Sequence, residues 1–563
     1  MRLPARKLDS ARTRGALIVF CLALAVRLMF FLATSDRQWP HSVLYEGDAP
    51  VWARWAEALD HGESFEFDLP MRTPGVAFLL HWVDGGRDLA SFALLKGLWC
   101  GLGAATVAAL FALTHRALGA RAAWLAALLA CFSFGSYQLA GSLNSEAPYA
   151  LLLVLLVGAT AQQAAAPRPG LALALGVLHG AALLLRAEHG LLMALFLPWG
   201  LAVNRTRASL QAAGLTLLAT LLVCAPWVLR SHAAVVNFNT SDPHPVNFTQ
   251  AAPPWSPEAQ AFLATLPAFA REGNFAYVQF LAQSSGKPRV EREDLERHFD
   301  LRFGYRPEPL AEWTLVSSKG AFDFALANHP ASGGGFSRAA LLDGFDATPE
   351  FAFGRPSHLR LYNRGFEVGW GFIRQDVPAW FRLVGRKFER FLDGASLGWT
   401  PWDLPHGGAH RRRSVDLSTP LEQSRAATIL LGILALAGLI LVARTPVGAL
   451  CALVLGHKLV ITALFYGYAR QAVSIQFVFA LFMAAALDRL LERARVPRSA
   501  AAVGLGVLFT ALLACDVIYV SGRRDFAIRP TAADLPIART PHWGAGAFES
   551  VGEIEILPRG PAK

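Results

Sequence analysis

Residues 45–75 read YEGDAPVWARWAEALDHGESFEFDLPMRTPG and lie between the first and second long apolar segments. Two acids, Glu46 and Asp48, precede a run with Trp52 and Trp55 whose spacing predicts a short amphipathic helix. The stretch closes on Arg72-Thr73-Pro74-Gly75, a turn-forming sequence. Because most of the remaining chain is apolar, we expect this polar loop, just outside a membrane span, to be the catalytic loop.

The composition indicates a polytopic membrane protein. Of its 563 residues, 54% are hydrophobic and 17% are charged, whereas soluble domains carry about 25% charged residues. The net charge of +10 would also suit a nucleic-acid partner. Basic residues gather instead in the short loops between apolar segments, which is typical of cytoplasmic loops. No nucleic acid is therefore expected.

Apolar stretches of about 20 residues predict about eleven transmembrane helices and an all-α fold. We place them at 15–34, 89–114, 122–141, 147–165, 170–186, 189–203, 208–228, 426–443, 447–466, 471–488 and 500–520. Lys and Arg cluster near the N-terminus and in alternate loops, so the positive-inside rule puts residues 45–75 on the external, periplasmic side of the inner membrane.

A large hydrophilic insert between the seventh and eighth spans falls on the same external side. We therefore expect four regions. These are an N-terminal membrane core at 1–230 with a first external loop at 35–88, an external loop domain at 231–424, C-terminal membrane helices at 425–520, and an external tail at 521–563. Within the insert, residues 291–301 and 379–393 have the pattern of amphipathic helices.

Ionisable groups at the ends of the spans are functional candidates, because placing them there is expensive. By the predicted topology they collect on the external face. The five groups are Glu46, Asp48 and Arg72; Asn144, Ser145 and Glu146; Arg186, Glu188 and His189; Trp227 and Arg230; and Tyr466, Tyr468 and Arg470. Carboxylates can take a proton from an acceptor hydroxyl, and arginines can hold a phosphate leaving group with forked hydrogen bonds.

The order of these motifs resembles the GT-C membrane glycosyltransferases. The resemblance is to the branch that holds protein O-mannosyltransferases, lipid A aminoarabinose transferases and bacterial family-39 enzymes. It rests on Asp48, Trp52, Ala56, Gly62 and Arg72–Gly75, then on Ser145-Glu146 with Pro148, Leu185–Glu188 with Gly190, and Ala225-Pro226-Trp227 with Arg230. These motifs cover roughly the first 230 residues, and Tyr468-Ala469-Arg470 matches more loosely.

The resemblance implies inverting transfer of a monosaccharide from a polyprenyl-phosphate donor, with Asp48 as the general base. It implies that Glu146 is a second cavity acid and that Arg72, Arg230 and Arg470 contact the phosphate. We add Arg186, Glu188 and Tyr468 as substrate-binding candidates. Family members often have an Asp-Glu pair where this chain has Glu46-Gly47-Asp48, so either acid remains a candidate for the base.

Simpler structural roles stand beside these assignments. Asp48 would also serve as a helix N-cap, and the arginines at the span ends would also suit snorkelling. For Arg27, Lys96 and Lys458, inside spans, pairing within the bundle or snorkelling is favoured over a direct role. For His189 and His457, packing or hydrogen bonding is favoured over metal binding.

The sequence thus predicts a membrane glycosyltransferase whose partners are the lipid-linked donor, the bilayer and an acceptor glycan, lipid or protein. No cofactor is assigned, and a need for a divalent metal stays open. The alternatives are a polymerase or ligase acting on lipid-linked glycans, a transporter or flippase, and a non-catalytic scaffold. Transporters typically show internal repeats and broken helices near the bilayer midplane, and this sequence reveals neither.

Overall fold

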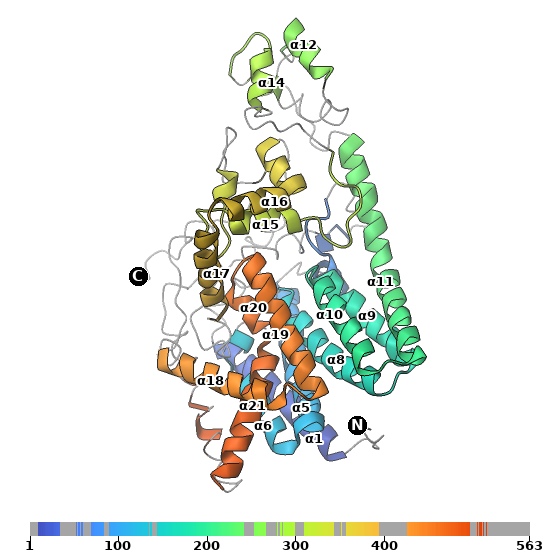
Figure 1. The fold of residues 1–563 in the computed structure, drawn as a ribbon, viewed down its shortest axis with the longest axis vertical. Coiled ribbons are helices and arrows are strands. Elements are labelled where there is room, and N and C mark those ends of the chain that lie inside the picture. The colour runs from blue at the N-terminus through green and yellow to red at the C-terminus, as the bar shows by residue number, and fades with distance from the viewer. Residues whose placement is uncertain are drawn as a thin grey trace.

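The computed structural model describes residues 10–33, 52, 55–56, 58–59, 69–83, 89–133, 135–137, 144–240, 253–265, 278–279, 282–283, 285–298, 309–342, 351, 356–392, 425–495, 504, 506–508, 510–511 and 514. Across these residues the regular structure is helical, and the β-structure is one isolated bridge between Trp255 and Val290. The all-α class is confirmed for this part of the chain (Figure 1).

Helices occupy ten of the eleven predicted spans. They are α1 (Ser10–Ala33), α5 (Leu89–Leu118), α6 (Ala120–Cys131), α8 (Glu146–Ala165), α9 (Pro169–Leu185), α10 (His189–Val203), α11 (Arg207–Thr240), α18 (Arg425–Val442), α19 (Pro446–Leu464), and α20 (Ala469–Val473) with α21 (Gln476–Arg493). Four described segments are long and apolar enough to cross a membrane: Leu94–Leu118, Glu146–Ala165, Arg207–Asn237 and Pro446–Leu464. The total of about eleven spans stays a prediction, because most of 500–520 lies outside the described residues.

Two predicted spans differ from the helices that form. The helix expected to reach residue 141 ends at Cys131; Phe132 and Ser133 are not helical, and residues 135–137 are helical again. The span predicted at 471–488 is divided at Ser474-Ile475 into α20 and α21. The Ser474 hydroxyl donates to the Gln471 carbonyl at 2.7 Å. Local side-chain bonds of this kind compete with a continuous helix.

Small residues allow the closest helix pair, α9 and α11, to pack backbone to backbone. A Cβ atom added at Gly176 would stand 2.5 Å from the Thr216 carbonyl oxygen. Thr216 and Thr220 on α11 donate to the Ala172 and Gly176 carbonyls on α9, both at 3.0 Å. Small residues at spacing four with threonine bonds across the interface are typical of helix association in membranes.

The C-terminal helices complete the bundle that the N-terminal helices begin. Helix α21 packs against α5 and α6, and α19 packs against α8 and α10. Helix α19 starts at a Thr445 cap, whose hydroxyl accepts from the Gly448 amide at 3.0 Å, and Pro446 follows at the first helical position. This arrangement brings residues near 458 and 470 beside residues near 146 and 188.

The insert forms a helical layer beyond one end of the bundle (Figure 1). Its helices are α12 (Pro257–Leu263), α14 (Arg292–His298), α15 (Gly320–Asn328), the short 3-10 helix η2 (Ala339–Leu341), α16 (Pro356–Gln375) and α17 (Val377–Leu392). Helices α14 and α17 match the two predicted amphipathic helices. Helix α11 continues through the expected start of the insert at 231, and the division into four regions stays a prediction.

The segment 310–318 joins the insert to the bundle. Trp227 of α11 donates its indole N–H to the Val316 carbonyl at 2.9 Å. The Ser317 hydroxyl donates to the Met71 carbonyl at 2.7 Å. The insert therefore packs on the closing part of the first loop as well as on α11.

Candidate functional site

The first external loop is described only in part, and both of its candidate bases, Glu46 and Asp48, lie outside the described residues. Trp52 and Trp55 are buried, in agreement with the amphipathic pattern. The Trp52 indole donates to the Thr73 carbonyl at 2.9 Å, and the Thr73 hydroxyl donates to the Leu185 carbonyl at 2.8 Å. The end of the loop is therefore held against the residue that precedes Arg186.

A charged network links three distant parts of the chain. The Arg186 guanidinium contacts the Glu146 carboxylate at 3.0 Å and the Glu188 carboxylate at 2.9 Å. Arg470 lies 3.6 Å from the same oxygen of Glu146. Lys458 forms an ion pair with Glu188. We call these five residues the charged network; they come from α8, the turn between α9 and α10, α19 and α20.

The network contains three cations and two carboxylates, so it carries a formal charge of +1. Burial raises the pKa of the Glu188 carboxyl, but the charges of Arg186 and Lys458 outweigh it and hold that pKa well below its ordinary value. Glu188 is therefore ionised at neutral pH. Among the described residues this net positive charge suits an anion at this place.

Glu146 offers an acceptor atom that the described protein does not use. Its side chain is 2% exposed, and its Oε1 atom receives the contacts from Arg186 and Arg470. Its Oε2 atom is buried and has no hydrogen-bond partner among the described residues. A buried carboxylate oxygen without a donor is costly, and a substrate hydroxyl would satisfy it.

A buried tyrosine supports the two cations of the network. The Tyr149 ring lies 5.7 Å from the Arg186 guanidinium carbon and 5.4 Å from the Lys458 nitrogen. Its hydroxyl is 3.1 Å from His189 Nδ1, and His189 Nε2 is 2.8 Å from His179 Nδ1. A hydrogen-bonded chain of this kind fixes the ring that faces the cations.

The other described candidates lie in aromatic contacts or beside the first loop. The Arg230 guanidinium stacks on Trp227 at 4.9 Å, and Trp227 packs on Trp55 of the first loop with ring centroids 5.6 Å apart. Arg72 is half-buried, directly before Thr73. Arg470 lies over the Tyr468 ring at 5.2 Å. The structure thus joins Glu146, Arg186, Glu188 and Arg470 directly. Tyr468 contacts Arg470, and Arg72 precedes the residue that binds Leu185.

Lys458 of the network and Tyr149 beside it were not selected as site residues from the sequence. Pairing of Lys458 within the bundle is confirmed, although its partner Glu188 belongs to the candidate site. The hydrogen-bonded roles of both histidines are also confirmed, since His457 contacts the Glu188 carbonyl at 3.0 Å. The only sequence signal was a lysine inside an apolar helix.

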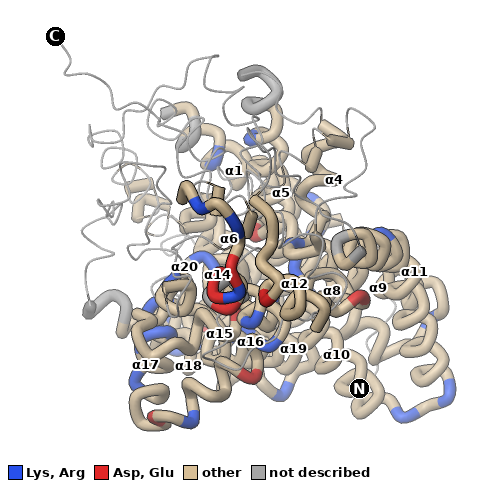
Figure 2. Tube along the Cα trace, turned by 90° about the horizontal axis from the view of Figure 1, so that it is seen from above, with Lys and Arg blue, Asp and Glu red and all other residues tan. Residues whose placement is uncertain are grey.

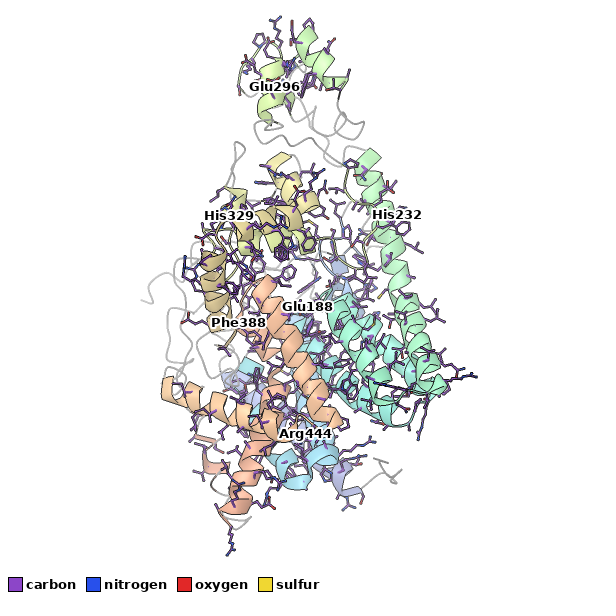
Figure 3. All side chains as sticks on the ribbon, in the orientation of Figure 1. Glu188, His232, Glu296, His329, Phe388 and Arg444 are labelled. Atoms are coloured by element: carbon purple, nitrogen blue, oxygen red, sulfur yellow. The ribbon has the colours of Figure 1, made fainter. Side chains whose placement is uncertain are left out.

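The charged network lies where the bundle meets the insert. Figure 3 places Glu188 at this junction and Arg444 toward the opposite end of α19. Figure 2 shows few charges along the bundle helices, while α17 of the insert carries several basic residues. Glu188 and Arg444 thus lie at different ends of the bundle, and which end is external stays a prediction.

Comparisons with known proteins give structural matches alone. No protein-family model matches the chain, and neither does any curated protein. The crystal structure of an Archaeoglobus fulgidus oligosaccharyltransferase in complex with Zn and sulfate matches with 15% identity and a TM-score of 0.37, covering 92% of this chain and 55% of that one. This chain therefore spans about half the length of that enzyme.

Cupriavidus metallidurans ArnT bound to undecaprenyl phosphate matches with 15% identity and a TM-score of 0.32, and its apo state with 16% and 0.31. In both cases the match covers 85% of this chain and 78% of ArnT. TM-scores below 0.5 carry no argument about this chain's chemistry, which rests on the site itself.

The described part of the chain contains no group of three or more His, Cys, Asp or Glu side chains that would hold a metal ion. What it does offer is a set of hydrogen-bond donors and positive charge beside an unsatisfied carboxylate oxygen. Such a site can bind an anionic group and a hydroxyl-bearing molecule next to each other.

Proposed function

We propose that the protein is an integral membrane glycosyltransferase that moves one sugar from a polyprenyl-phosphate donor to an acceptor on the external face. The observation that carries this proposal is the charged network. Residues near 146, 188 and 470 meet there, with surplus positive charge and a buried acceptor oxygen on Glu146. A phosphate leaving group and an acceptor hydroxyl are the two chemical groups that such a site suits.

In the proposed reaction the acceptor hydroxyl attacks the anomeric carbon of the sugar. The new bond joins that carbon to the acceptor oxygen, and the bond to the phosphate oxygen breaks with inversion. Asp48 takes the hydroxyl proton, and Glu46 is the alternative base. Polyprenyl phosphate leaves with its charge held by Arg186 and Arg470, and Arg72 and Arg230 approach it from the adjoining elements.

Glu146 has two tasks in this proposal. Its Oε1 atom holds Arg186 and Arg470 in place, and its Oε2 atom accepts a hydrogen bond from a substrate hydroxyl. The insert at 231–424 covers the external end of the bundle and takes part in acceptor binding. The active site then faces the periplasm or exterior of the inner membrane.

The test is sugar transfer from a panel of radiolabelled polyprenyl-phosphate sugars, with wild type and Asp48→Asn purified in the same detergent. We expect transfer by the wild type and a loss of about 100-fold or more in the variant, the size of a general-base contribution. Glu46→Gln is the matched control on the same loop. Full activity in Asp48→Asn together with loss in Glu46→Gln would exchange the two roles. Absence of transfer with every donor and acceptor class would exclude the proposed function.

A further inference from the structure

The carboxyl end of α19 is held by side chains of the insert. A helix leaves its last carbonyl groups without partners inside the helix. Asn328, at the end of α15, donates its side-chain amide to the Leu464 carbonyl at 2.8 Å. Lys387 of α17 donates its side-chain nitrogen to the Ala463 carbonyl at 3.1 Å. Two helices of the insert therefore supply hydrogen-bond partners to the last two residues of α19.

Asn328 uses every hydrogen-bonding position of its side chain. Its amide nitrogen donates to the Phe324 carbonyl as well as to Leu464, both at 2.8 Å. Its oxygen accepts the Trp380 indole N–H and the Lys387 nitrogen, both at 2.9 Å. An asparagine side chain offers two N–H donors and two acceptor lone pairs, so this buried residue is fully satisfied. Its partners therefore allow one orientation of the amide.

The chain that leaves α19 is held again at Gly467. Its backbone N–H donates to the Gly334 carbonyl of the insert at 2.9 Å. A Cβ atom at Gly467 would stand 2.0 Å from the Lys387 carbonyl oxygen, so a glycine is needed for this close approach. Gly334 has a φ of 95°, a left-handed conformation that also favours glycine. The backbones of the insert and the bundle meet at these two glycines.

The place of Arg470 depends on this junction. Arg470 is the second residue of α20, a helix of five residues. A helix this short is not stable by itself, so its position is set by the chain at its ends and by its neighbours. It packs against α17 of the insert and α8 of the bundle, and Arg470 reaches the Glu146 carboxylate at 3.6 Å. A shift of the Gly467 backbone would therefore move the Arg470 guanidinium.

We propose that Asn328 and Lys387 are positioning residues that act through Arg470. By holding the end of α19 and the chain at Gly467, they set where the Arg470 guanidinium meets the donor phosphate. The insert thereby completes the donor site, in addition to the acceptor binding proposed for it. This inference rests on the proposed function, which supplies the phosphate contact of Arg470.

The first experiment measures initial rates of sugar transfer at a series of donor concentrations. Wild type is compared with Lys387→Met and with Gly467→Ala, which keeps every charged side chain. The matched control is Gly385→Ala, at an exposed position of α17 where a Cβ atom would meet nothing within 4 Å. We expect both variants to lower kcat/KM for the donor by about 10-fold or more, because misplacing a substrate contact is costly. The control should match wild type.

Double variants separate positioning from a general loss of structure. Arg470→Met should lower kcat/KM by about 100-fold, and adding Lys387→Met should cause no further loss. Substitutions that act on the same contact are not additive, whereas the losses from independent substitutions multiply. Thermal unfolding shows whether each variant is folded. If Lys387→Met does not fold, Gly467→Ala combined with Arg470→Met supplies the same comparison.

The place of residue 470 can also be followed without sugar transfer. In Arg470→Cys, the rate of modification by a thiol reagent is measured above the background of protein without this cysteine. Adding Gly467→Ala should change that rate by about 3-fold or more, because thiol reactivity follows exposure and surroundings. Adding Gly385→Ala should leave the rate unchanged.

The proposal is overturned if the losses in the double variant multiply, or if neither single variant has a lower kcat/KM than the control. It is also overturned if Gly467→Ala leaves the modification rate of Arg470→Cys unchanged. Absence of transfer by the wild type would instead exclude the proposed function. The modification rate would then still decide whether the insert sets the place of residue 470.

Discussion

At the scale of single residues, Glu188 connects three residues at the charged network. It binds Arg186 and Lys458 with its carboxylate and His457 with its carbonyl. Removing its charge leaves two cations close together in a mostly buried place. This arrangement makes Glu188 the residue whose loss should affect the fold as well as the site.

Glu188→Gln should lower the free energy of unfolding by about 3–5 kcal/mol at neutral pH, the cost of removing one partner of a buried pair. The matched control is Glu492→Gln, whose pair with Arg489 is exposed at 66% and 55% and should contribute no more than about 1 kcal/mol. Chemical denaturation of both variants beside wild type measures the difference. Equal effects of the two substitutions would show that the network contributes no more than a surface pair.

The pH dependence of the same comparison follows from the lowered pKa of Glu188. An acid whose pKa is lowered in the folded state makes its full contribution to stability above its pKa in the unfolded chain, about 4.3 for Glu. That contribution is lost only as the pH falls from there through the folded value. The gap between wild type and Glu188→Gln should therefore be constant from pH 8 to about pH 5 and shrink below about pH 4.

At the scale of elements, α17 is fastened to the end of α19 by one buried lysine. The Lys387 nitrogen donates to the Asn328 side-chain oxygen at 2.9 Å and to the Ala463 carbonyl at 3.1 Å. A Cβ atom at Gly467 would stand 2.0 Å from the Lys387 carbonyl oxygen. Since Tyr468 and Arg470 follow directly, this junction sets where the site's last arginine lies.

Burial lowers the pKa of Lys387 to about 7. Between that value and the unfolded value, about 10.4, the unfolded chain binds more protons than the folded chain, so stability rises with pH. The stability of wild type relative to Lys387→Met should therefore rise from pH 7 to pH 9. Below about pH 6 the difference in stability between the two proteins should stay constant. Thermal unfolding across this pH range measures the stability difference, with Arg382→Met on the exposed side of α17 as the control. Parallel curves for wild type and Lys387→Met would contradict the prediction.

The sequence predicted helices well and their junctions poorly, for a physical reason. A run of about 20 apolar residues specifies a span almost by itself, so α8, α9 and α10 start or end within a residue of the expected positions. The break at Ser474 coincides with a bond from its hydroxyl to the Gln471 carbonyl, and α6 ends at Cys131 before a break at Phe132 and Ser133. Neither changes the hydropathy pattern.

For the candidate site, too, the residues were predictable from the sequence and their connections were not. The cost of placing charge at span ends singled out Glu146, Arg186, Glu188 and Arg470. Their connection through Lys458 was not foreseeable, because Lys458 and Glu188 are 270 positions apart and every external acid was an equal candidate for pairing. The Tyr149–His189 contact depends on how α8 and α10 pack, which composition does not specify.

At the scale of the whole molecule, the predicted orientation is directly testable with cysteines at two exposed positions. Arg289→Cys lies in the insert before α14, and Arg444→Cys lies in the turn between α18 and α19. In intact cells a membrane-impermeant thiol reagent should modify the first within minutes and the second only after permeabilisation. Labelling is compared with the background of unsubstituted protein, and the reverse pattern would invert the topology and exclude a periplasmic site.

Helix α11 also limits how the insert can be exchanged between proteins. Its 34 residues span about 51 Å, some 20 Å more than the hydrocarbon core of a bilayer. Along this extension Trp227 binds Val316, and Asn239 binds Leu310 through both of its amide atoms. Adding one residue between these anchors would turn the upper one by about 100°. The insert therefore cannot be exchanged by joining two chains at residue 231. A chimera that carries the insert must also carry the part of α11 that contacts it, without a change in helix length.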